Sequence, residues 1–372
     1  MEAALTILLD GLQFSSYLFI VSAGLTIIFG VMKILNVAHG SFYAWGAYTA
    51  AFFIGKFSDM GLPDALGFLI IVAAAIVVGV ILGFIIEQGI LKHMYERDEV
   101  LIVLATFGLF LVLEDIILIA FGTDPYFAYQ PMALLDSVEL GGITRDVYGM
   151  TLIGVAAVVA VGCWWLLNKT KWGTLLKAVI FDREMGISMG INVPLVYTLT
   201  FIGGAILGGL GGAYIAPTIS VAPGLGTEVI VLSFAVVVVG GMGSIAGAAI
   251  GSLIIGILRA IAVHELPQVE LFVVFAVMAI VLVFRPEGLF APFAKRVGAV
   301  GINSKLLENL ISAGAFDCLE TDRARLFDAV KMLLSEATIA QNERKEGQSN
   351  LFGEEEISES RTLREVAPWS PV

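Results

Sequence analysis

Charged residues are scarce in this sequence. Asp, Glu, Lys and Arg make up 15% of the 372 residues, whereas hydrophobic residues make up 58%. A soluble domain carries charged residues at about a quarter of its positions. The shortage excludes an ordinary soluble protein and predicts a chain that crosses a membrane several times. The net charge of −12 also argues against nonspecific binding of nucleic acid, so we expect no such partner.

Cysteine, histidine and catalytic motifs are equally sparse. Cys163 lies in an apolar run and Cys318 in the C-terminal tail, so the two cysteines form neither a disulfide framework nor a metal-binding spacing. His39, His93 and His264 form no metal-binding motif, and no phosphate-binding G-x-x-x-x-G-K-[ST] loop occurs. We therefore predict no cofactor, no metal and no nucleotide hydrolysis by this chain.

Long apolar runs occupy most of the first 285 residues. A run of about 20 apolar residues is long enough to cross the hydrocarbon core as a helix. We predict spans at 12–34, 39–56, 65–90, 100–121, 149–168, 195–216 and 269–285, and a glycine-broken region at 227–263. Glu2 and Asp10 are acidic where a cleavable signal peptide would be basic, so we expect the first span to be retained.

The broken region leaves the number of crossings open. If it is divided at residues 240–244, its first piece has about 14 residues and reaches only about 21 Å, which is too short to cross upright. We therefore predict an all-α, polytopic membrane protein with eight or nine transmembrane segments, one of them broken or re-entrant.

Basic residues set the expected orientation. They follow the third, fifth and last spans: Lys92, Arg97, Lys169, Lys171, Lys177, Arg183, Arg285, Lys295 and Arg296. The connection 122–148 carries one basic residue, Arg145. Because cytoplasmic loops are enriched in Lys and Arg, we place the N-terminus outside and the end of the membrane domain in the cytoplasm.

A cluster of polar, aromatic and glycine residues interrupts the apolar sequence between Asn36 and Tyr48. Read as a helix, one face carries Asn36, His39, Gly40, Tyr43 and Gly46. Unpaired polar groups are costly in hydrocarbon, so this face is expected to point into protein or water. Two interpretations stay open: these residues line or brace a solute pathway, or they join neighbouring helices by hydrogen bonds.

Two glycine-rich regions favour close contact between helices. Glycines recur at every fourth position in the sixth span and in the broken region: Gly204, Gly208 and Gly212, then Gly247 and Gly251. The break itself contains Gly240, Gly241, Gly243 and Ser244. Tight packing explains most of these glycines, but the break also resembles the discontinuous helices that present backbone dipoles to a solute, so we include it in the predicted pathway.

Glu114 and Asp115 lie inside the fourth predicted span. A carboxylate within a membrane is costly and is a candidate functional site by default. The alternative, which we favour, is that both acids lie near enough to the outer interface to reach water.

The segment 169–193 is too long and too regular for a simple connection. Residues 174–181 have the pattern of an amphipathic helix, with Leu175, Leu176, Val179 and Ile180 apolar and Lys177 polar. Such a helix either presents a surface to a soluble partner or rests on the bilayer.

Four motifs together resemble a transporter family. They are Asn36–Tyr43 with Gly46–Tyr48, Lys169–Gly173 leading to Asp182 and Gly190–Asn192, Gly240–Ser244, and Arg285–Phe290. Residues 1–297 are thereby similar to the LivH-type permease of bacterial branched-chain amino-acid ABC importers. The resemblance implies a non-enzymatic inner-membrane subunit that works with a second homologous permease, two ATP-binding subunits and a periplasmic solute-binding protein.

The same resemblance implies that segment 169–193 docks on an ATP-binding subunit. The residues expected to couple ATP hydrolysis to transport are Gly173, Lys177, Asp182, Glu184 and Gly190. Because similar permeases import urea or short amides, the resemblance leaves the identity of the transported solute open. A channel or ion-coupled carrier that uses Glu114 and Asp115 is a rival of another class. An intramembrane enzyme that uses His39 would lack a positioned nucleophile.

Residues 298–372 differ from this family and form a predicted soluble, acidic tail. Asn303–Asp317, Arg323–Leu326 and Gly347–Gly353 resemble a fragment of the bacterial DNA polymerase III alpha subunit, without its catalytic carboxylates. We expect short helices at 303–315 and 322–343 and a disordered end. A chimeric or misassembled reading frame explains this junction better than a purposeful fusion does. Sequencing source DNA and transcript across the codons for 290–305 would decide between them.

Overall fold

The structure is a computed structural model that describes residues 2–140, 142–285 and 288–290. All of them belong to one compact unit, Met1–Ala299. The helices expected at 303–315 and 322–343, and the disordered end after them, lie outside the described residues.

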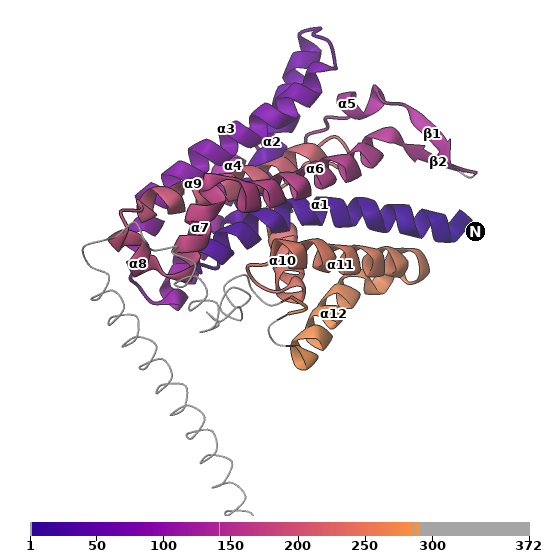
Figure 1. Cartoon of the computed structure of the whole chain (residues 1–372). Helices are drawn as coiled ribbons and strands as arrows, with labels where there is room; N and C mark the ends of the chain where they lie inside the picture. The colour runs from indigo at the N-terminus through magenta and orange to yellow at the C-terminus, as the bar shows by residue number, and fades with distance from the viewer. Residues whose placement is uncertain (1, 141, 286–287, 291–372) are drawn as a thin grey trace, which may run out of the picture. The chain divides into compact units, whose positions relative to one another are not determined.

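Helices account for most of the described chain (Figure 1). They are α1 (Glu2–Met32), α2 (His39–Asp59), α3 (Leu66–Gly89), η1 (Leu91–His93), α4 (Glu99–Phe121), α5 (Gln130–Ala133), α6 (Val147–Lys169), α7 (Lys171–Phe181), α8 (Arg183–Ser188), α9 (Val193–Ile215), α10 (Leu225–Gly240), α11 (Ile245–Glu265), η2 (Pro267–Val269) and α12 (Glu270–Phe284). The strands β1 (Ser137–Leu140) and β2 (Ile143–Asp146) pair antiparallel, with Val138 opposite Arg145.

Six of these helices are long and apolar enough to cross a membrane: α1, α3 with η1, α4, α6, α9 and α11. The helix α2 has 21 residues but is less apolar, and α10 and α12 are shorter apolar helices. The described residues therefore form an all-α membrane protein with one small hairpin. The expected eight or nine crossings exceed the six that length and composition support.

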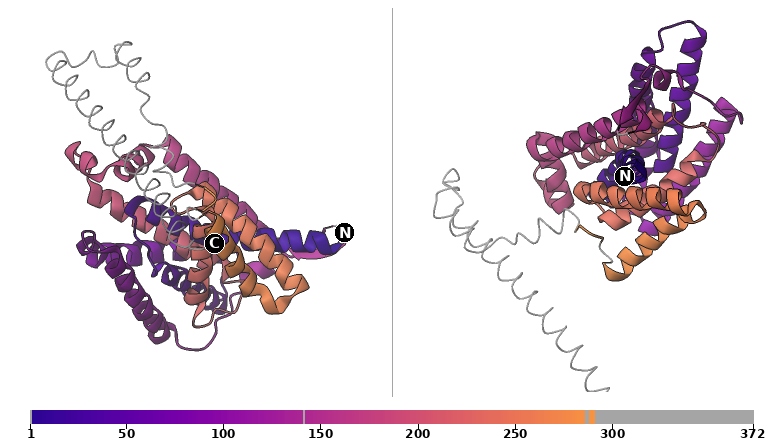
Figure 2. Two further views of the ribbon diagram at one scale, coloured as in Figure 1. Left: turned by 90° about the horizontal axis from the view of Figure 1, so that it is seen from below. Right: turned by 90° about the vertical axis from the view of Figure 1, so that its right-hand side faces the viewer.

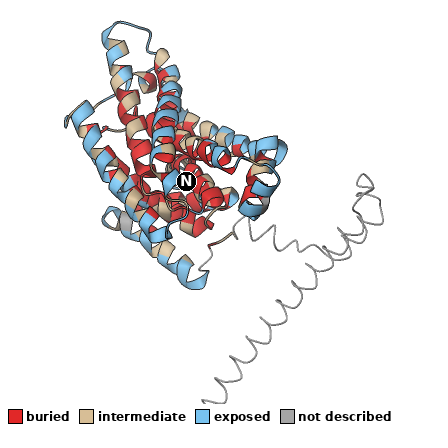
Figure 3. Ribbon diagram, turned by 90° about the vertical axis from the view of Figure 1, so that its left-hand side faces the viewer, coloured by how far each residue is buried: buried red, intermediate tan, exposed pale blue. Residues whose placement is uncertain are grey.

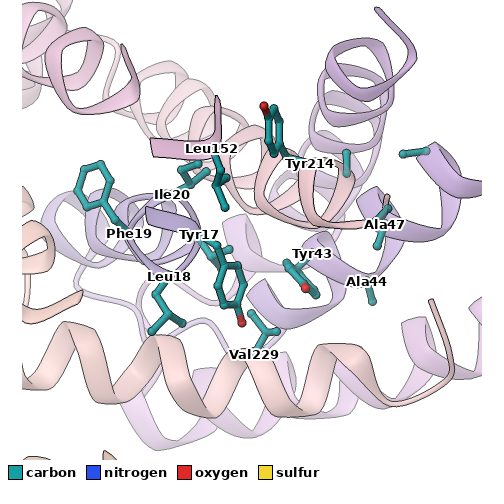
Figure 4. Packing of buried hydrophobic residues seen from close by; sticks show 14 of the residues in the cluster. Tyr17, Leu18, Phe19, Ile20, Tyr43, Ala44, Ala47, Leu152, Tyr214 and Val229 are labelled. Carbon is teal, nitrogen blue, oxygen red and sulfur yellow. The ribbon is translucent and has the colours of Figure 1, made fainter. Parts of the chain in front are cut away.

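Helix α1 lies in the middle of the bundle, in contact with α6, α9, α10 and α11 (Figure 2). Leu18 and Ile20 are fully buried there, in one cluster with residues of α2 and α9 (Figure 4). Buried residues fill the interior, while apolar side chains of α3, α4 and α6 are exposed on the outside (Figure 3). This distribution suits a bundle whose outer surface meets lipid.

The first residues of α1 are held by charged partners from distant segments. Arg145 of β2 forms a salt bridge with Asp10 and also donates to the Thr6 carbonyl at 3.2 Å. His264 of α11 contacts the second carboxylate oxygen of Asp10 at 2.8 Å. Helix α1 accordingly begins ten residues before the span predicted from apolar residues alone, because tertiary contacts satisfy its polar first turns. This cluster and α7–α8 lie at opposite ends of α1 (Figure 1).

Candidate functional site

Asn36 lies in the turn between α1 and α2, not on a helical face. Helix α1 ends at Met32, and Lys33 adopts a positive φ of 58°. The Asn36 carbonyl accepts the His39 N–H at 3.3 Å, and the regular helix begins only there. The predicted continuous face is therefore wrong at Asn36, because the chain changes direction after Lys33.

His39 is fully buried between α1 and α9. Its Nε2 lies 3.0 Å from the Val21 carbonyl oxygen, and its ring meets the Phe42 ring edge-on at 5.7 Å between centroids. A Cβ added at Gly24 or Gly208 would come within 3.1 Å of the imidazole. The ring thus occupies space that two glycines leave, and it joins α2 to both neighbouring helices.

The other motif residues bring the α2 backbone close to α9 and α10. Gly40 lies against the first turn of α10, and Gly46 lies against the backbone of Gly209 on α9. Tyr43 is buried, with its ring 6.1 Å from that of Tyr17 on α1 (Figure 4). Gly40, Tyr43 and Gly46 thus lie in close contacts between helices.

Several buried polar atoms have no hydrogen-bond partner among the described residues. They are Ser22 Oγ and Thr26 Oγ1 on α1, both amide atoms of Asn36, Nδ1 of His39, and Ser233 Oγ on α10. An unpaired buried polar group costs about 1–3 kcal/mol, so such atoms mark places where water or a polar solute would bind. Asn36, fully buried with both side-chain atoms unpaired, is the strongest candidate in the motif for such contact.

The glycines predicted for helix packing each lie against another helix. Gly204 meets α1, Gly208 and Gly212 meet α2, and Gly247 and Gly251 meet α10. Backbone-to-backbone approach of this kind is what small residues permit within a membrane.

The segment Gly240–Ser244 is a tight turn between α10 and α11. Gly241 and Gly243 have φ values of 105° and 82°, which favour glycine. Ser244 begins α11 by accepting the Gly247 N–H at 3.1 Å. The turn packs on α1, where Gly243 lies against Gly30. Both parts of the predicted pathway therefore contact the same central helix.

Residues 289 and 290 form backbone hydrogen bonds with the C-terminal end of α10. The Leu289 N–H donates to the Val239 carbonyl at 2.9 Å, and the Phe290 N–H donates to the Gly240 carbonyl at 3.0 Å. Two of the carbonyls that a helix end leaves unpaired are thus satisfied.

Glu114 and Asp115 have different surroundings. Asp115 is exposed, whereas Glu114 is half-buried and accepts the backbone N–H of Gly224, directly before α10. The other oxygen of Glu114, Oε1, has no hydrogen-bond partner within the described part of the chain. A carboxylate at the start of a helix is stabilised by the helix dipole. Glu114 thus links α4 to α10.

A sharp corner joins α6 to α7. Thr170 Oγ1 accepts the Gly173 N–H at 3.2 Å, and a Cβ at Gly173 would collide with the backbone of Leu167. Lys177 Nζ donates to Asn168 Oδ1 at 3.0 Å. These bonds fix α7 against the end of α6.

The rest of the predicted coupling segment is largely exposed. Asp182 separates the two helices, donating its N–H to Ala178 and accepting from Gly186 through its backbone. Glu184 is exposed on α8, and Gly190 has a φ of 80°. Large apolar side chains are exposed on the same segment: Trp172, Phe181, Ile187 and Met189. This surface suits an apolar partner or the bilayer.

Glu87 is a buried acid that the sequence analysis missed. Its two oxygens accept hydrogen bonds from the hydroxyls of Tyr95 and of Thr198, the latter at 2.6 Å. Burial, and then the bond to Glu87, raise the pKa of the Tyr95 phenol above its ordinary value, so the phenol remains a donor. The signal available in the sequence was one carboxylate near the end of a long apolar run.

This network connects α3 to α8. The Tyr95 ring meets the Tyr197 ring edge-on at 5.1 Å, and the Arg183 guanidinium lies 6.0 Å from the centre of the Tyr197 ring. A cation over an aromatic face is attracted by the ring quadrupole. The link therefore runs from a membrane-spanning helix into the predicted coupling segment.

Comparison with known proteins gives the family. A family model described as the permease component of the branched-chain amino acid transport system matches residues 7–283. The permease BraD of Pseudomonas aeruginosa is 27% identical over 290 residues, which cover 76% of this chain and 94% of that protein. The probable permease LivH of Methanocaldococcus jannaschii is 28% identical over 319 residues, covering 82% and 95%.

A shorter part of the chain is similar to a protein that is not a permease. An 80-residue stretch is 30% identical to the DNA polymerase III subunit alpha of Caulobacter vibrioides and covers 22% of this chain but 7% of that protein. It agrees in kind with the polymerase-like motifs seen after residue 301. The family match, by contrast, extends over most of the helices described above. The chain therefore belongs to the family of branched-chain amino acid transport system permease components.

Proposed function

We propose that this chain is the membrane-spanning permease subunit of an ATP-driven importer and that it carries branched-chain amino acids across the bacterial inner membrane. The observation that carries the proposal is the match of residues 7–283 to permease components. Six apolar helices suit a multi-pass pathway protein. A second homologous permease, two ATP-binding subunits and a periplasmic binding protein would complete the system.

The coupling surface in this proposal is α7–α8. It lies at the opposite end of α1 from the N-terminus (Figure 1), which suits a cytoplasmic segment and an N-terminus outside. Its exposed apolar side chains would seat on an ATP-binding subunit. The contacts of Lys177 with α6 and of Arg183 with Tyr197 would transmit movement of the ATP-binding subunits to the bundle as a rigid-body shift.

The solute would pass beside α1, where both predicted pathway elements meet. Asn36 and the break at Gly240–Ser244 would supply polar contacts for the zwitterionic end of an amino acid. His39, Tyr43 and the surrounding glycines would brace that path. Because a binding protein delivers the solute, the permease itself needs little affinity for it.

An ion-coupled carrier is the rival that a specific observation favours, because Glu114 holds an unpaired carboxylate oxygen inside the bundle. The test is uptake by the complete assembly in proteoliposomes. We expect labelled leucine, isoleucine and valine to accumulate when ATP is enclosed, with unlabelled urea and acetamide failing to compete. Accumulation driven by an ion gradient without ATP would contradict the proposal. Competition by urea would show that the transported solute is urea or a short amide and not a branched-chain amino acid.

A further inference from the structure

A cavity of about 450 Å³ lies beside α1, between α6, α7 and α11. Its volume falls within the range of ligand sites, about 300–1,000 Å³. Apolar side chains from three helices form most of its wall: Phe19, Ile27, Ala160, Leu167, Ile245 and Ala249. A site of this kind within the membrane domain suits a hydrocarbon chain.

The cavity opens onto the outside of the bundle. Trp164, which lines it, is 56% exposed, and Val158 and Val161 of the same helix are 72% and 64% exposed. These residues belong to the face of α6 that would contact lipid. A bilayer lipid therefore reaches the cavity from the exposed face of α6 without passing through the protein.

Polar groups are gathered where α7 borders the cavity. Lys177 and Asn168 both line it and are joined at 3.0 Å, while Lys169 and Lys171 are exposed beside them. The described wall contains no Asp or Glu. Trp165 and Trp172 are exposed at the same corner, and tryptophan is enriched where a bilayer meets water. Positive charge at this level attracts anionic lipid.

One deeper polar atom also points to a ligand. Thr26 lines the cavity, is 1% exposed, and its Oγ1 lacks a hydrogen-bond partner among the described residues. An ester or glycerol oxygen below a phosphate group would pair with this hydroxyl. If the cavity held only hydrocarbon, the Thr26 hydroxyl would stay without a hydrogen-bond partner, and its burial would destabilise the fold.

We propose that this cavity binds one phospholipid with an anionic head group. An acyl chain would occupy the space between α1, α6 and α11, and the phosphate would lie at Lys177 and Asn168. Gly243 and Ser244 of the proposed pathway also line the cavity, so a solute such as leucine is the competing occupant that the test has to exclude.

The test uses the full-length chain in phosphatidylcholine vesicles, with Trp164 as the reporter. Trp45, Trp165, Trp172 and Trp369 are replaced by Phe, and a minor fraction of lipid brominated on the acyl chain is added as quencher. Brominated phosphatidylglycerol is expected to quench Trp164 with about fivefold higher apparent affinity than brominated phosphatidylcholine. This is the gain in affinity that the attraction between one lysine and an anionic lipid provides. Equal quenching by the two lipids would overturn the proposal.

Two independent variants separate the head-group and chain contacts. Lys177→Gln should abolish the preference for phosphatidylglycerol, and Ala160→Leu should abolish it by filling the cavity while Lys177 remains. The matched controls are Lys171→Gln, which removes a charge outside the cavity wall, and Val158→Leu, which enlarges an exposed residue of α6. An equal loss of the preference in either control would show that the effect comes from diffuse charge or from any change on α6, and it would overturn the proposal. Relief of the quenching by added leucine would show that the cavity holds the solute instead, and it would overturn the proposal as well.

Discussion

The Nε2 atom of His39 lies 3.0 Å from the carbonyl oxygen of Val21, so the first residue of α2 is hydrogen-bonded to the middle of α1. A carbonyl only accepts, so Nε2 is the donor of this bond, while Nδ1 has no hydrogen-bond partner among the described residues. We expect His39→Ala to lower the free energy of unfolding by about 1–3 kcal/mol, because it removes this bond and empties the space between Gly24 and Gly208. Thermal unfolding of the detergent-purified chain measures the change. His93→Ala, at an exposed residue of η1, is the control and should leave the midpoint unchanged.

Two glycines on α2 form a matched pair. A Cβ at Gly46 would collide with the backbone of Gly209, whereas a Cβ at Gly55 would meet nothing within 4 Å. Gly46→Ala should therefore destabilise the chain by about 1–3 kcal/mol through overpacking. Gly55→Ala should be neutral or stabilising by up to about 1 kcal/mol, because alanine favours a helix. Equal effects of the two substitutions on the unfolding midpoint would contradict the close contact of α2 with α9.

A double-mutant cycle can measure the coupling energy between Glu87 and Tyr95. Glu87→Gln and Tyr95→Phe each disrupt a hydrogen bond of the buried Glu87, and leaving a buried polar group without its partner costs about 1–3 kcal/mol. We expect the double variant to be destabilised by less than the sum of the single variants. Glu96→Gln, at an exposed residue, is the control. Strict additivity in chemical denaturation would show that the pair is not coupled.

The longer helices are predictable because their apolar runs end where the helices end. The bounds of α3, α4, α6, α9 and α12 lie within two residues of the predicted spans. The start of α1 was missed because Asp10 lies in its early turns, and its partners, Arg145 and His264, are far away in sequence. Periodicity contains no information about such pairs.

The candidate site was predictable in composition but not in geometry. The polar residues at Asn36 and His39 stand out from their apolar surroundings, yet their pattern did not show that a turn separates them. Glu87 was missed for the opposite reason. An acid near the end of a span resembles an interfacial residue, and Thr198, the residue that buries it, lies 111 positions away.

Segment α7–α8 is the proposed route from ATP hydrolysis to transport. We expect Lys177→Ala and Asp182→Ala to lower ATP-driven leucine uptake by about tenfold or more, while membrane insertion and ATP hydrolysis by the assembly persist, because the segment would no longer transmit movement. Uptake and phosphate release are measured on the same proteoliposomes. Lys56→Ala, at the end of α2, is the charge-matched control and should transport normally. Normal uptake by both α7–α8 variants would remove the coupling role.

The proposal as a whole requires that energy come from other subunits. The most direct measurement is accumulation of labelled leucine in liposomes that hold the purified chain alone, compared with liposomes that hold the complete assembly, both with enclosed ATP. The chain alone is predicted to release no phosphate and to concentrate no solute, whereas the complete assembly does both once its binding protein is added. Concentrative uptake by the isolated chain would contradict the account.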